Sequence, residues 1–247
     1  MKHTTLLLLI LVTLTAQAQQ TEGVVSYERV SHWSKLYARM SYLSQEEKDR
    51  AQNTWKNNDE WKEKMKLTFT ADQSHYTYAE EQGQSENGDY SWRQDDYLII
   101  RDFAKEHSTD IIEMLGKTYI VDDSLRVPVW KIGDQIKDVA GHVCMKATTY
   151  DAVRDQQIMA WFAQDIPVSA GPERYTGLPG LILELDINNG DVVIEAKKVE
   201  FKAVAAELKL PKMKGKRIKE TDYTMLISNH IAQSIKAHRN PFWAIRY

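Results

Sequence analysis

The sequence predicts an α+β fold that is predominantly antiparallel β, arranged as a curved sheet or partly open barrel with a few packing helices. Short segments rich in β-branched and aromatic residues alternate with turn residues along most of the chain. Residues 141–150 alternate two sets of side chains with the period of two that is typical of a strand. Asn189 and Gly190 lie between two apolar segments, and this pair favours a tight hairpin.

The first predicted elements are a strand at residues 23–30 and a polar helix. Ser44 and Glu47 have the spacing of a capping box, so a helix is expected to begin there and to continue as an exposed polar stretch through residue 66. Trp55 and Trp61 would lie about 240° apart around such a helix. They form no single stripe, and no binding site is expected there.

The middle of the chain reads as strands. Residues 66–78 and 96–103 are rich in β-branched and aromatic residues, and turn residues at 87–89 separate them as in a meander. A short strand is expected at 117–121. Residues 158–163 are nearly all apolar, which indicates a strand covered on both faces.

A bend and a hairpin follow. Pro179 and Gly180 fit the two central positions of a type II turn, in which the glycine takes a positive φ. The Asn189-Gly190 turn, of type I′, then fixes the register of the hairpin. The expected pairs are Ile187 with Val192, Leu185 with Ile194, Leu183 with Ala196, Asp186 with Val193, Glu184 with Glu195, and Ile182 with Lys197.

Two like charges face each other in this hairpin. Glu184 opposite Glu195 destabilises the pair unless something intervenes. Lys197, diagonal to Glu184, is expected to relieve the repulsion. Alternatively, these two glutamates and Asp186 bind a cation.

The C-terminal part contains a predicted helix capped by Thr221 or Asp222. Its apolar positions recur at helical spacing and should dock on the sheet; they are Tyr223, Leu226, Ile227, Ile231 and Ile235. Residues 242–247 could form a last short strand. The basic residues of 209–219 indicate a solvated loop, or contact with an anionic envelope surface.

The N-terminus indicates export. Lys2, an apolar run at 6–14 and a small-residue site that ends at Ala18 are typical of a secretory signal peptide. The run is shorter than the roughly 20 residues that span a bilayer, so no transmembrane segment is expected. We therefore expect a signal peptide at 1–18, cleaved near Ala18, and one β-rich domain at 19–247 that is periplasmic or secreted.

Composition narrows the possible partners. The single cysteine, Cys144, excludes an internal disulfide and does not lie at the cleavage site, where a lipoprotein would need it. The formal charge is -3, which argues against nucleic acid as a partner. A monomer is expected.

Motifs of common enzymes and cofactors are missing. The sequence contains no Gly-x-Ser-x-Gly elbow, glycine-rich phosphate loop or zinc-protease helix, and its histidines are scattered. These observations predict a protein that is not an enzyme and carries no cofactor. A hydrolase would need a serine, a histidine and an acid that converge in one cleft.

His142 and Cys144 are candidate metal ligands. Residues two apart on a strand point to one face, and a thiolate with an imidazole suits copper or zinc. Two ligands are too few for a closed zinc site. The alternative is structural, with Cys144 as a buried, unreactive core residue.

Arg174 and Tyr175 are candidate ligand or partner contacts. Gly171-Pro172 and Gly177 bracket them, so they lie on a loop, where binding groups are commonly displayed. The alternative is that Tyr175 packs in the core and Arg174 pairs with a nearby acid.

These residues surround a motif with a known family resemblance. Gly177, Leu178, Pro179, Gly180, Leu181 and Ile182 spell the sequence from which the GLPGLI family takes its name. The chain resembles this family of exported proteins from diderm bacteria most specifically over 117–201, where Trp130, Cys144 and Trp161 also agree. Residues 151–154 differ from the usual Gly-Arg pattern. The motif itself reads as a structural signature.

The resemblance implies a periplasmic, β-rich protein associated with outer-membrane transport, with a fold similar to lipoprotein carriers. The family has no established activity. We expect a non-enzymatic binding or accessory protein of the envelope, whose curved sheet holds an apolar small ligand or an envelope transport protein. Copper or zinc handling and hydrolysis are the alternatives.

Overall fold

A computed structural model describes residues 21–84, 90–212 and 214–247. The predicted signal peptide at 1–18 and the predicted turn at 87–89 lie outside the described residues. In the part that is described, no helix is long and apolar enough to cross a membrane.

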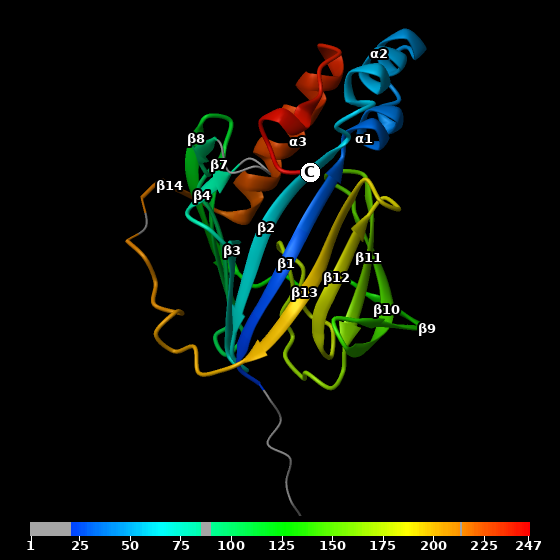
Figure 1. The fold of residues 1–247 in the computed structure, drawn as a ribbon. Coiled ribbons are helices and arrows are strands. Elements are labelled where there is room, and N and C mark those ends of the chain that lie inside the picture. The colour runs from blue at the N-terminus through cyan, green and yellow to red at the C-terminus, as the bar shows by residue number, and fades with distance from the viewer. Residues whose placement is uncertain (1–20, 85–89, 213) are drawn as a thin grey trace, which may run out of the picture.

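The core of the fold is one large curved sheet, drawn in Figure 1. Its strands run in the order β14-β8-β7-β6-β3-β2-β1-β13-β12-β11-β10-β9, and all neighbours are antiparallel except β14 and β8. The strands in the described residues are β1 (Gly23–His32), β2 (Glu60–Phe69), β3 (Gln73–Tyr78), β6 (Tyr97–Asp102), β7 (His107–Met114), β8 (Lys117–Ser124), β9 (Lys131–Val139), β10 (His142–Asp151), β11 (Gln156–Ala163), β12 (Leu181–Ile187), β13 (Val192–Phe201) and β14 (Lys216–Ile218). A separate pair joins β4 (Gln82–Gln84) to β5 (Ser91–Arg93).

The predicted fold class is confirmed, and the sheet is not closed into a barrel. β1, β2 and β13 form its middle, and the rest bends into two wings that face each other (Figure 1). We call β3, β6, β7 and β8 the first wing, and β9 to β12 the second wing. The side between the wings is concave.

The polar helix is shorter than predicted. Helix α1 (Trp33–Arg39) follows β1, and α2 (Gln45–Trp55) begins with the expected capping box at Ser44 and Glu47. The stretch to residue 66 is not helical, because β2 already begins at Glu60. In this part of β2, the buried residues Met65 and Leu67 alternate with lysines. The apolar residues therefore recur every two positions, as in a strand, but the lysines give the stretch the composition of a polar helix.

The β12–β13 hairpin has the predicted register from Glu184 to Ile187 but another turn, and the predicted pairs of Leu183 with Ala196 and Ile182 with Lys197 are not among its strand pairs. Ile187 pairs with Val192, and Glu184 faces Glu195. Asn188, Asn189 and Gly190 all have positive φ, and the Asp191 N–H donates to the Ile187 carbonyl at 3.0 Å, so four residues connect the strands.

Tertiary contacts explain this turn. Arg39 donates from Nη2 to the Asn188 carbonyl at 2.6 Å and from Nε to Asp191 at 2.5 Å. The Asn188 amide also donates to the Tyr247 hydroxyl at 2.7 Å. These partners come from α1 and the end of the chain. Their contacts outweigh the local preference of Asn189-Gly190 for a two-residue turn.

The like-charge pair in this hairpin is relieved by another lysine. Lys137 of β9 lies 2.6 and 2.5 Å from the two carboxylate oxygens of Glu184. Lys197 pairs instead with Glu195 at 2.7 Å. Among the described residues, no group of three potential ligands could hold the alternative cation.

The bend at Pro179 and Gly180 is not a type II turn, because Gly180 does not have a positive φ. The glycine is required by close packing: a Cβ there would lie 2.2 Å from the Ala163 carbonyl oxygen. Leu181, Ile182 and Leu183 are fully buried directly after it. The motif therefore brings the start of β12 against the end of β11.

Helix α3 (Glu220–Lys236) begins slightly earlier than predicted, and its cap comes from another element. The Asp123 carboxylate of β8 accepts a hydrogen bond from the Glu220 N–H at 3.1 Å. Tyr223 and Ile227 of the apolar face are buried, so the predicted docking on the sheet is confirmed there, whereas Ile235 at the end of the helix is 40% exposed. Figure 1 shows α1, α2 and α3 gathered at one end of the sheet.

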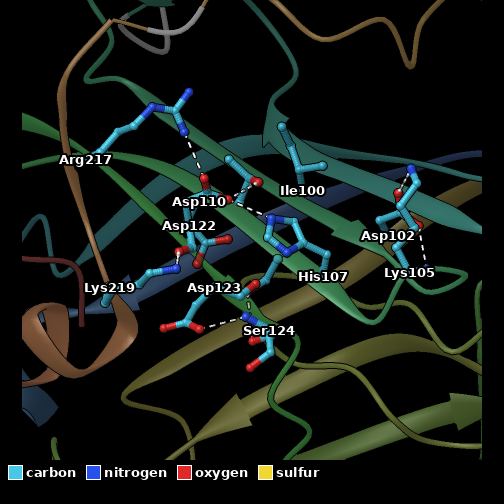
Figure 2. A network of polar contacts seen from close by, with 12 residues as sticks. Ile100, Asp102, Lys105, His107, Asp110, Asp122, Asp123, Ser124, Arg217 and Lys219 are labelled. Atoms are coloured by element: carbon cyan, nitrogen blue, oxygen red, sulfur yellow. Dashed lines mark hydrogen bonds and ion pairs between the residues drawn. The ribbon is translucent and has the colours of Figure 1, made fainter.

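The basic segment before α3 is partly ordered as a strand. β14 pairs with β8, and Arg217 lies 2.8 Å from Asp122. The same carboxylate lies 2.6 Å from His107, and the Asp122 carbonyl accepts from Lys219 at 2.9 Å (Figure 2). These contacts fix the start of α3 to the first wing.

The last residues do not form the predicted strand. Pro241–Trp243 is a 3-10 helix, in which the Asn240 side chain accepts from the Phe242 N–H at 2.9 Å. After it, Ile245 is buried and Arg246 points into the concave side, as its contacts below show.

The close packing of Gly180 gives a stability test. Gly180→Ala should lower the free energy of unfolding by about 1–3 kcal/mol, because the added methyl group must displace backbone. Gly133→Ala is the matched control, since its nearest atom would be the Lys146 carbonyl oxygen at 3.7 Å. Urea unfolding of both variants measures the difference. Equal stability of the two would contradict this role of Gly180.

Candidate ligand cavity

The loop between β11 and β12 crosses the concave side of the sheet. It leaves the second wing after Ala163 and returns to it at Leu181. Between them, Glu173 reaches Tyr97 of the first wing, and Arg174 reaches Asp110 of β7. The loop thus connects the two wings through its charged side chains.

Glu173 lies at the centre of a buried network. It accepts hydrogen bonds from the Tyr97 hydroxyl and from Arg246 Nε, the latter at 2.9 and 3.1 Å. Arg29 Nε lies 3.4 Å away. The side chains of Glu173 and Arg29 are only 8% and 5% exposed, so these charges depend on one another.

Glu63 completes this network. It accepts from Arg29 at 2.9 Å, and Arg246 lies 3.5 Å from its other oxygen. Burial raises the pKa of the Glu63 carboxyl, but the charges of Arg246 and Arg29 outweigh it and hold the pKa below its ordinary value. The carboxylate is therefore ionised in the folded protein.

Arg174 belongs to a second network. Its Nε donates to Asp110 at 2.6 Å, its Nη2 donates to Glu220, and its guanidinium lies 4.5 Å from the centre of the Tyr223 ring. Burial raises the pKa of Asp110, yet the charges of Arg101 and Arg174 outweigh this and lower it. Arg174 thus joins the loop to β7 and α3. This agrees with the alternative interpretation of the sequence, in which Arg174 pairs with a nearby acid.

Tyr175 is less constrained. Its ring meets Trp130 edge to face at 6.1 Å, and the Trp130 Nε1–H donates to the Thr176 carbonyl at 2.8 Å. The Tyr175 hydroxyl makes no hydrogen bond to the described residues. Burial raises the pKa of this phenol, so it stays protonated and can donate.

Arg174 and Tyr175 line a cavity of about 280 Å³ between the two wings. Its apolar lining residues include Ile112, Met114, Ile187, Ile227 and Ile245. Its polar lining residues include Thr149 and Asp151 of β10, Gln156 of β11, and Arg154 of the turn between these strands. The structure therefore brings the two predicted contact residues together at one site.

A second hollow of about 400 Å³ lies beside the first. Both are lined by Tyr97, Ile112 and Met114, and by the segment that contains Arg246 and Tyr247. This segment forms part of the wall of both spaces. Trp33, Trp61 and Trp243 also line the second hollow.

The candidate metal ligands have other partners. His142 Nδ1 lies 2.7 Å from Asp165, and Cys144 is fully buried. The pKa of the Cys144 thiol is raised to about 12, and burial is the main cause. Within the described residues, no cluster of three His, Cys, Asp or Glu side chains could hold a metal.

Sequence reasoning missed Gln156 and Thr149. They lie on neighbouring strands, and the register of β10 with β11 places them on one face. The only local signal was the polar pair Gln156-Gln157 before the apolar strand at 158–163. Their shared position depends on strand pairing, which no local pattern specifies.

Comparisons with known proteins support the fold. Residues 151–184 match a family described as "Protein of unknown function (Porph_ging)", and this match includes the loop and the bend. No curated protein matches the chain. Two structures of PNGF-II, in space groups C2 and P21, are similar, with TM-scores of 0.55 and 0.56 and identities of 14% and 13% over 84% of this chain. This chain spans about a third of their length (32% and 33%), and at such identities the likeness shows the fold alone.

The buried network predicts a large cost for removing one charge. Glu173→Gln should lower the free energy of unfolding by about 3–5 kcal/mol, because two buried guanidinium groups lose their shared anion. Glu195→Gln is the control, since that side chain is 45% exposed and should cost less than about 1 kcal/mol. Denaturant unfolding compares them. A small cost for Glu173→Gln would show that the network is not what holds the loop.

The lowered carboxyl pKa values of Glu63 and Asp110 predict acid sensitivity. Their contribution is fully present above the ordinary carboxyl pKa of about 4 and is lost as the pH falls through the lower folded values. The midpoint of urea unfolding should therefore decrease from about pH 5 down to about pH 2. Glu63→Gln should show a smaller decrease. An equal decrease in this variant would contradict the contribution of Glu63.

Proposed function

We propose that this chain is an exported, non-enzymatic binding or accessory protein of the bacterial envelope, and that its cavity holds a small ligand with an apolar body. The observation that carries the proposal is the cavity between the wings. A curved sheet with a solid core would have left only a surface role. Its volume of about 280 Å³ is near the lower end of ordinary ligand pockets.

The walls of the cavity support an apolar ligand body. Ile112 and Met114 come from the first wing, Ile187 from the second, and Ile227 from α3. A ligand that displaces water from these side chains gains about 25 cal/mol for each Å² of apolar surface that it covers. Such sites commonly combine apolar walls with a few polar groups that orient the ligand.

The envelope assignment rests on the sequence. The residues at 1–18 support secretion to the periplasm or beyond, and the motif from Gly177 to Ile182 supports membership of the GLPGLI family. The match of residues 151–184 to a family of unknown function spans the same motif. An accessory role beside an envelope transport protein follows from the family resemblance.

The alternatives lack a comparable observation. Copper or zinc handling would need further ligands near His142 and Cys144, and the described residues provide no such cluster. Hydrolysis would need an activated nucleophile. Among the described residues, no serine or cysteine side chain is hydrogen-bonded to a histidine ring.

Filling the cavity tests the proposal. The fluorescence of 1-aminoanthracene, a neutral apolar probe, should rise saturably when it binds the purified protein. Thr149→Trp should weaken this binding at least about tenfold, because an indole then occupies the cavity. Thr148→Trp is the matched control, since adjacent strand residues point to opposite faces and Thr148 does not line the cavity.

The controls separate folding from binding. Far-ultraviolet circular dichroism and thermal unfolding show whether each variant keeps the native fold. Absence of saturable binding to the unmodified protein would overturn the ligand-binding function. Equal loss of binding in both variants would place the probe elsewhere.

A further inference from the structure

A buried amide in the cavity has no partner. The side chain of Gln156 is 1% exposed, and its Nε2 is buried without a hydrogen bond. Its Oε1 also makes no hydrogen bond to the described residues. An unsatisfied buried amide costs about 1–3 kcal/mol, so its position at the cavity lining indicates that something else satisfies it.

Two other unpartnered groups belong to residues that line the same cavity. Thr149 faces Ile158, and Gln156 faces Asp151, so the register of β10 with β11 places Thr149 and Gln156 on the same side of the sheet. Neither the Thr149 hydroxyl nor the Tyr175 hydroxyl makes a hydrogen bond to the described residues. All three groups line one cavity.

Tyr175 lines the cavity together with Asp151, at the end of β10, and Arg154, in the turn after it. Arg154 donates to Asp151 at 3.1 Å and to the Tyr223 hydroxyl at 2.9 Å. The arginine is held in position by these bonds, and it gives this part of the cavity a positive group beside the Asp151 carboxylate.

We propose that the ligand carries a carboxylate, which accepts hydrogen bonds from the Gln156 amide and the hydroxyls of Thr149 and Tyr175 while its apolar body lies against Ile187 and Ile227. This proposal rests on the proposed function and names its ligand class. Three neutral donors and a neighbouring guanidinium favour an acceptor group with several lone pairs. An alcohol offers a single oxygen and leaves donors unsatisfied, so the carboxylate binds more tightly.

A pair of ligands with the same alkyl chain tests this preference. Octanoate and octanol are compared by isothermal titration calorimetry at about pH 7, where the acid is ionised. Octanoate should bind at least about tenfold more tightly, as charge-assisted hydrogen bonds are stronger than neutral ones. Equal affinity for the two would overturn the carboxylate assignment but leave the binding function standing.

Gln156 is then replaced by methionine, which has a similar length and no amide. Gln156→Met should weaken octanoate about tenfold and change octanol by no more than about twofold. Gln157→Met is the matched control, because Gln157 is the next residue of β11 and is exposed on the other face. It should leave both affinities unchanged.

A second variant keeps the test decisive if the first does not fold. Gln156→Leu also removes the amide and introduces no buried charge, so it should weaken octanoate about tenfold and change octanol little. Unchanged binding of octanoate to the folded Gln156 variants would overturn the proposal. Absence of binding by both ligands, with the 1-aminoanthracene signal intact, would overturn it as well. Loss of all three signals would reject the proposed function itself.

Discussion

The buried carboxylate of Glu173 is the contact on which the concave side depends. It lies in a loop that starts and ends in the second wing, yet it accepts hydrogen bonds from Tyr97 in the first wing and from Arg246 near the end of the chain. Arg29, in the central strand, lies within ion-pair distance. One side chain thus joins four distant segments, and the side chains of these charges are at most 15% exposed, so little solvent compensates for its loss.

The cavity exists because this loop crosses the concave side without filling it. Glu173 has a positive φ of 56°, a conformation that is uncommon for a residue with a side chain. Its neighbour Arg174 then reaches β7 and α3, so consecutive residues serve two separate ion networks. Tyr175 meets Trp130 beyond them. The loop is held by the second wing at both ends and by the ion pairs of Glu173 and Arg174. The cavity beside it remains open to a ligand.

Local patterns predicted most strands of both wings and missed one strand in each, β7 in the first and β9 in the second. The alternation at 141–150, the apolar run at 158–163 and the register of the hairpin all follow from side-chain periodicity. β7 carries the polar run His107 to Asp110, and β9 is almost entirely exposed, so neither has a clear period. Arg174 and Tyr175 could be selected from the turn residues around them. Gln156 and the partners of Glu173 could not, because strand pairing and long-range ion pairs alone bring them to the site.

The position of β1 has a consequence for the order of events during folding. One neighbour, β2, follows it closely in the chain, but the other, β13, pairs Phe201 with Gly23. Until the later strand has been synthesised, one edge of a largely buried central strand has no partner. Unpaired edges of this kind invite association with other chains, and such distant pairings slow folding. A newly made chain is therefore prone to association until β13 pairs with β1. A chaperone that covers the open edge of β1 would act before the cavity forms.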